Sequence, residues 1–242
     1  VNSDALVSAL NLLILLCRDD EARKRLYTCD CVVTLRKLLY LPNTPIDTQE
    51  LCLSLLSRLS ALKFCRQVIL DNGLLPVIVS LIQKNLEDPG MVLCGLACLN
   101  YLAYHNYAVC KKLCEGNNFS LIILCCVSYV EKKDIGIVTQ SLGVISCILA
   151  MSVKDQDKDK SLIIPLLAND IVPLLDKMIV IFLRSPKIMF QCVSSIHMLS
   201  LNEEGLTYLK NVDGLIDHLM AVLDTPTNLE ATKRMTLLIL KR

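Results

Sequence analysis

The stretch CRQVILDNGLLPVIVSLI, residues 65–82, joins a polar segment to a strongly apolar run through the turn-forming pair Asn72-Gly73. The same phrase recurs as RKRLYTCDCVVTLRKLL (23–39), NDIVPLLDKMIVIFL (169–183) and TYLKNVDGLIDHLMAVL (207–223). With Cys31, Gly73, Gly116, Asp170 and Gly214 as equivalent anchors, the intervals are about 42, 43, 54 and 44 residues. A period in this range is typical of helical solenoids, in which each unit buries its apolar face against its neighbours.

Each unit is predicted to hold three helices. In the second unit, residues 63–72 form a short polar helix, 74–84 an apolar helix, and 90–105 a longer amphipathic helix. Asp88-Pro89 precedes the third helix, as expected where a carboxylate caps free amides and proline occupies the first turn. We therefore predict an all-α, right-handed α-solenoid of about five units after a leading helix. The expected single domain, 1–242, divides into 1–18 (partial), 19–61, 62–105, 106–153, 154–201 and 202–242, with a charged loop insertion at 153–160.

The charge and the hydropathy of the chain argue against binding driven by its overall charge and against a membrane span. The chain has 25 basic and 24 acidic residues, a net charge of +1, and thus no overall field for nucleic acid or an anionic membrane. Residues 135–153 carry no charge, and a membrane-spanning helix needs roughly 20 apolar residues. Because this stretch includes Thr139 and Gln140, we favour a helix buried inside the solenoid, and no membrane association is predicted.

Cysteine is unusually frequent, at thirteen residues, and an odd number cannot be fully paired within one chain. Most cysteines lie in apolar runs, where a free thiol behaves as a small hydrophobic group. This usage indicates a reducing compartment, the cytoplasm or the nucleus. Cys94, Cys98, Cys110 and Cys114 have a spacing that would suit zinc thiolates if their helices met, but the buried role is favoured, and we predict no metal and no cofactor.

No sequence signature of catalysis is present. The chain lacks phosphate-binding loops, H-E-x-x-H and G-x-S-x-G, and its three histidines, His105, His197 and His218, fall in different units. Basic residues cluster on the short first helices without interleaved aromatic side chains, which is not the pattern of a single-strand nucleic-acid binder. We predict that the chain is not an enzyme.

The phrase CGLACLNYLAYHN (94–106), which closes the second unit, resembles the third helix of armadillo repeats. HEAT repeats have a similar period. The armadillo resemblance implies a concave surface formed by the third helices, on which an asparagine hydrogen-bonds the backbone of an extended peptide. Asn100 matches that asparagine. No Trp exists anywhere in the chain, so it departs from the nuclear-import receptors of that family, which pair the asparagine with a tryptophan.

Counting 27 residues from the anchors extends this concave surface to other units. The position of Asn100, 27 residues beyond Gly73, corresponds to Arg58 and His197, and to Ser146 or Cys147 in the third unit. The residues four places earlier and the nearby tyrosines would add contacts. The complete predicted partner-binding set is Arg58, Asn100, His197, Ser54, Leu96, Tyr101, Tyr104 and Val193.

The sequence thus predicts a non-catalytic protein-interaction scaffold or adaptor. Its partner would place an extended segment or an amphipathic helix on the concave third-helix surface. Two alternatives stay open: a nucleic-acid-binding helical repeat, and a chaperone or exchange factor that regulates a folded partner. Self-association through the terminal repeats is a further possibility, because end units of a solenoid expose apolar faces.

Overall fold

The computed structural model describes residues 3–41, 43–154 and 160–242, and these residues form helices and turns without a β-strand. Pro42 and most of the predicted charged insertion, residues 155–159, lie outside this range. The helices are α1 (Ser3–Leu16), α2 (Asp20–Thr28), α3 (Cys31–Tyr40), α4 (Ile46–Ser60), α5 (Lys63–Asp71), α6 (Leu74–Lys84), α7 (Pro89–Ala103), α8 (Tyr107–Cys114), α9 (Asn118–Glu131), α10 (Ile135–Lys154), α11 (Ile163–Ala168), α12 (Ile171–Phe182), α13 (Pro186–Ser200), α14 (Glu203–Lys210), α15 (Leu215–Asp224) and α16 (Glu230–Leu240).

After α1, the helices repeat in threes: a short first helix, an apolar second helix and a long third helix. The first and second helices meet nearly at right angles, 85° between α5 and α6 and 81° between α8 and α9. A residue in the left-handed conformation makes this corner in every repeat, because its positive φ turns the chain sharply within one position. These residues are Asp30, Gly73, Gly116, Asp170 and Gly214, with φ between 52° and 79°.

The first of these corners lies one residue earlier than the repeat register of the sequence predicts. Cys31 is the first residue of α3, and Asp30 before it has the positive φ of 52°. Aspartate is among the few residues other than glycine that occupy this region readily. Counting 27 residues from Asp30 leads to Ser57, so Ser57 and not Arg58 is the equivalent of Asn100. Ser57 and Asn100 are also both the twelfth residue of their helices, α4 and α7.

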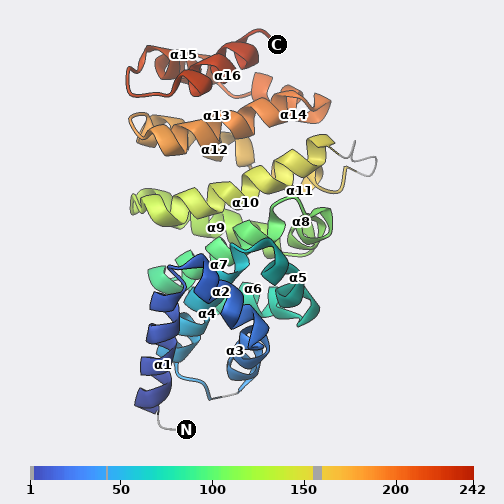
Figure 1. The fold of residues 1–242 in the computed structure, drawn as a ribbon. Helices are drawn as coiled ribbons and strands as arrows, with labels where there is room; N and C mark the ends of the chain where they lie inside the picture. The colour runs from blue at the N-terminus through green and yellow to red at the C-terminus, as the bar shows by residue number, and fades with distance from the viewer. Residues whose placement is uncertain (1–2, 42, 155–159) are drawn as a thin grey trace. The chain divides into compact units, whose positions relative to one another are not determined.

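The contacts divide the chain into two compact units, Val1–Leu102 and Ala103–Arg242, where the sequence predicts a single domain. The boundary falls at the end of α7, between two repeats. In the second unit the third helices α10, α13 and α16 pack in succession, and α12 packs between α9 and α15 (Figure 1). The third helices of successive repeats therefore lie next to one another and together form one surface of the second unit.

Helix α10 is the described helix that is long and apolar enough to cross a membrane, over Ile135–Val153. Within the second unit, however, 67% of its most apolar segment is buried. It packs against α8, α9 and α13, so neighbouring helices already cover its apolar surface. Helix α10 is strongly apolar because it packs against other helices on several sides.

Every cysteine of the described residues is a free thiol, and most are buried. Cys98 Sγ donates to the carbonyl oxygen of Leu53 at 3.7 Å, and Cys110 Sγ donates to that of Ala103 at 3.5 Å. Cys114 Sγ lies 4.0 Å from the carbonyl oxygen of Leu162. These thiols fill small core spaces and use backbone acceptors, the role expected of buried free cysteine.

Candidate functional site

The surface of interest in the first unit is the solvent side of α4 and α7, which we call the third-helix face. It consists of the fifth, ninth, twelfth and thirteenth residues of each helix, a stripe spaced by three or four residues that follows the helical period. Its residues are exposed or half-buried, whereas the opposite side of each helix, which includes Leu53, Leu56, Leu96 and Leu99, packs into the core. The members are Glu50, Ser54, Ser57 and Arg58 from α4, and Leu93, Ala97, Asn100 and Tyr101 from α7.

Helices α4 and α7 lie side by side along this face. The Cys98–Leu53 hydrogen bond joins them in the core, and above it Cys94 lies close to Ser54 and Arg58. Burial raises the pKa of the Cys94 thiol, and a hydrogen bond with Ser54 opposes that effect. The negative charge of Glu50 raises this pKa further, and the positive charge of Arg58 lowers it. Polar side chains of α4 therefore lie beside Cys94 of α7 on this face.

The end of this face where both helices begin is acidic. Burial, followed by the negative charges of Asp88 and Asp47, raises the pKa of the Glu50 carboxyl. Glu50 also closes over Gly90 so tightly that a Cβ at Gly90 would lie 2.1 Å from Oε1 of Glu50. Asp88 Oδ1 accepts a hydrogen bond from the amide of Met91 at 3.1 Å and caps α7, as the Asp-Pro pattern predicts.

The opposite end of the face is basic and aromatic. Arg66 of α5 donates through Nε to the carbonyl oxygen of Ser60 at 2.9 Å and through Nη2 to that of Ala61 at 3.2 Å. Its guanidinium also lies 5.8 Å from the ring centroid of Tyr101, within the range of a cation–π contact. Tyr101 is 38% exposed and Leu93 is 37% exposed, so the face offers large apolar side chains beside its polar groups.

Two residues predicted to supply apolar contact do not reach the surface. Leu96 and Val193 are fully buried, and the expectation that they contact a partner is wrong. The reason is helical geometry: a step of four residues back from a half-buried position rotates by about 40° toward the core. Leu93 and Ala97 occupy the outer positions in α7. The sequence missed these two residues and Glu50, although Glu50, Ser54 and Arg58 show the spacing of four that marks one helix face.

The second unit carries the equivalent face on α13. Phe190, the equivalent of Leu93, is 39% exposed, and His197, the equivalent of Asn100, is half-buried. Burial and the positive charge of Arg242 lower the pKa of His197, which favours the neutral imidazole. Arg242 Nη1 donates to the carbonyl oxygen of Ser200 at 2.9 Å. Nδ1 of His197 is buried and has no hydrogen-bond partner among the described residues.

Two further predicted positions of the second unit differ in their surroundings. Ser146 of α10, another equivalent of Asn100, forms a hydrogen bond between its Oγ and Oγ of the buried Ser195 at 3.0 Å. Tyr104 lies in the turn after α7 and not on a third helix. Its ring packs edge-on against His105 with a centroid distance of 4.2 Å, and it is 54% exposed.

Two cavities of the first unit are lined by residues outside the third-helix face. A cavity of about 440 Å³ lies between α3 and α6 and is lined by Tyr40, Pro76 and Lys84 among others. A second, of about 390 Å³, is lined by residues of α1 and α3 with the turn that precedes α4. Among the described residues, no group of three His, Cys, Asp or Glu side chains is arranged to hold a metal ion.

Comparisons with known proteins bear on the fold. No protein-family model matches the chain, and no curated protein matches it significantly. Among solved structures, it is similar to a designed armadillo repeat protein in complex with the peptide (KR)4, with a TM-score of 0.74, 17% identity, and coverage of 97% of this chain and 91% of that one. It is also similar to computationally designed armadillo repeat proteins for modular peptide recognition, with a TM-score of 0.77, 17% identity and the same coverages.

A third similar structure is an engineered protein with a TM-score of 0.77 and 14% identity, which covers 100% of this chain and 55% of that chain. At these identities the similarity is one of fold. It agrees with the three-helix repeats, the left-handed corners and the succession of third helices described above. The chain has the armadillo-repeat fold, as the resemblance of residues 94–106 implies.

Proposed function

We propose that the chain is a non-catalytic interaction scaffold that binds a peptide segment of a protein partner on its third-helix faces. The observation that carries this proposal is the composition of the face on α4 and α7. Half-buried polar groups, including Asn100 and Arg58, alternate there with the exposed apolar side chains of Leu93 and Tyr101. Polar groups of this kind set the register of a bound segment, and exposed aromatic or aliphatic groups supply most of the affinity.

The similar structures support the same proposal at the level of the fold. Designed armadillo repeat proteins are described as built for modular peptide recognition, and one is in complex with the peptide (KR)4. In this chain the first-unit face has an acidic end at Glu50 and a basic, aromatic end at Arg58, Arg66 and Tyr101. A segment with a cation near the start of α4 and α7 and an acidic residue near their ends would match these charges.

The two helices would act on the segment through different groups. The side-chain amide of Asn100 carries both a donor and an acceptor, the two kinds of group that an extended backbone can pair with. The guanidinium of Arg58 suits a carboxylate, because its planar donors bind two oxygens at once. Tyr101, held by Arg66 at 5.8 Å, contributes a rigid apolar surface that loses little conformational freedom on binding.

The test compares variants of the face with a variant of another surface. Asn100→Ala, Arg58→Glu and Tyr101→Ala each remove one group that faces solvent, so the melting temperature is expected to stay close to that of the original chain. Lys63→Glu, on the exposed side of α5, is the matched control for Arg58→Glu. The partner captured by the immobilised original chain is measured for each variant by quantitative mass spectrometry.

We expect Tyr101→Ala to reduce the retained partner about tenfold, since a central aromatic contact is typically worth about 1–2 kcal/mol. Arg58→Glu should reduce it more than Lys63→Glu does. Equal retention by all four variants would contradict the assignment of the face. Equal losses for Arg58→Glu and Lys63→Glu would show attraction by charge alone.

A further inference from the structure

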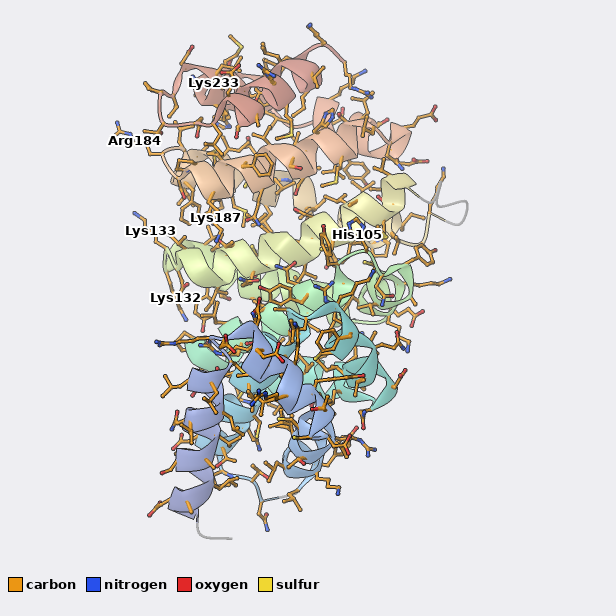
Figure 2. The ribbon with its side chains drawn as sticks, in the orientation of Figure 1. His105, Lys132, Lys133, Arg184, Lys187 and Lys233 are labelled. Carbon is orange, nitrogen blue, oxygen red and sulfur yellow. The ribbon has the colours of Figure 1, made fainter. Side chains whose placement is uncertain are left out.

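The second unit carries a cluster of positively charged side chains that lies apart from the third-helix face of the first unit. Five cations lie at the turns where second helices lead into third helices, and they occupy one edge of the unit in Figure 2. One of them, Lys132, has its ammonium nitrogen 4.5 Å from the ring centroid of Tyr129. We call the surface of the other four the basic edge. Its residues are Lys133 between α9 and α10, Arg184 between α12 and α13, Lys187 in the first turn of α13, and Lys233 in the first turn of α16.

The acidic side chains nearest in sequence are already engaged. Glu131 pairs with Lys177 at 3.1 Å, and Glu230 pairs with Arg234 at 3.4 Å. Asp134 uses Oδ1 to accept the amide of Ile137 at 2.9 Å, which caps α10. Among the described residues, the four cations of the basic edge form no ion pair.

Helix stability does not account for these charges. Cations next to a helix N-terminus are disfavoured, because the aligned peptide dipoles place a partial positive charge there. Helix α13 has Arg184 and Lys187 at this end, no acidic residue in its first turn, and no side-chain hydrogen bond from its cap residue Ser185. At the start of α13 the two positive charges therefore oppose the helix dipole, and a bound anion would offset that cost.

The spacing of the cations fits an extended peptide. Because α10, α13 and α16 pack in succession, their starts are separated by about 8–10 Å, the usual distance between packed helices. An extended peptide in the polyproline II conformation advances about 3.1 Å per residue with three residues per turn, so every third side chain points to the same side and meets each successive repeat. An acidic residue at every third position would place one carboxylate near each turn of the basic edge.

The surroundings of the cations favour peptide carboxylates over a polyphosphate or a lipid surface. Ile135 and Leu229, at the starts of α10 and α16, are 53% and 51% exposed, and they are aliphatic groups that provide no platform for base stacking. The side chains of Glu131 and Glu230 are 66% and 74% exposed and separate the cations from one another, an arrangement that suits spaced carboxylates better than a continuous polyanion. We propose that the basic edge binds an extended acidic peptide segment, with carboxylates on the cations and apolar side chains against Ile135 and Leu229.

The test measures the affinity of the full chain for a fluorescein-labelled peptide of repeated Glu-Leu-Ser units, by fluorescence anisotropy at low and at physiological salt. The variant combines Lys133→Glu, Arg184→Glu and Lys187→Glu. The control combines Lys111→Glu, Lys112→Glu and Lys210→Glu, on the first helices α8 and α14, and changes the net charge equally. Circular dichroism checks the fold, and if the Glu variant unfolds, the same three residues are changed to Gln.

We expect the basic-edge variant to weaken binding about tenfold or more, from three lost charge pairs, and the control variant to change it less than twofold. A peptide of Lys-Leu-Ser units should not bind. Equal losses in both variants would overturn the proposal, because they would indicate unspecific attraction. It would also be overturned if single-stranded RNA or phosphatidylserine vesicles bound more tightly than the peptide and lost that binding in the same variant.

Discussion

At the scale of single residues, the left-handed corner is the feature on which each repeat depends. Gly73 has φ of +67°, and a Cβ there would meet no atom within 4 Å, so the cost of another residue comes from the backbone alone. Gly73→Ala should lower the free energy of unfolding by about 1 kcal/mol. Gly73→Asn should cost less, because asparagine tolerates this conformation. Urea unfolding measures both, and an equal cost for Ala and Asn would contradict the explanation.

The buried thiols predict how stability depends on pH. Burial, with the neighbouring Cys31, raises the pKa of Cys52 from 9.0 to about 12. Between these values the unfolded chain loses the thiol proton and the folded chain keeps it, so the stability contribution is full below pH 9 and declines as pH rises. Cys52→Ala should reduce the slope of unfolding free energy against pH by about 1.4 kcal/mol per pH unit in that window. An unchanged slope in urea titrations would refute this.

At the scale of helices, Arg66 connects the end of α4 with the third-helix face. It supplies donors to the carbonyl groups of Ser60 and Ala61, which have no partner within the helix, and it lies against Tyr101. Arg66→Ala should lower the free energy of unfolding by about 1–2 kcal/mol. Arg66→Lys should recover only part of this, since an ammonium group keeps the charge and loses the planar fork. Thermal and urea unfolding of both variants measure the difference, and full recovery by Lys would contradict the role of the fork.

The helices also show which features of the fold can be predicted from the sequence and which cannot. The period, the glycine corners and the Asp-Pro cap predicted the three-helix repeats, because each depends on local backbone chemistry. The first corner was placed one residue late, since Asp30 between two cysteines does not stand out as a glycine does. That displacement assigned Arg58 the position that belongs to Ser57. Leu96 and Val193 were misplaced because only the packing shows which side of a helix is covered.

At the scale of the whole molecule, the two compact units carry different surfaces. The first unit has a third-helix face with an acidic and a basic end, and the second unit has the face on α13 together with the basic edge. Helix α10 packs on three neighbours, which supports its role as a core element of the second unit.

The central claim is that a partner segment lies on the third-helix face, and site-specific photo-crosslinking tests it most directly. Tyr101 on α7 and Phe64 on α5 are 38% and 40% exposed, so a photoreactive phenylalanine at either site is equally accessible. Phe64 packs against Tyr27, with ring centroids 4.8 Å apart, on the first helices. We predict a crosslink to the captured partner from position 101 and none from position 64. A crosslink from position 64 with none from position 101 would contradict the account.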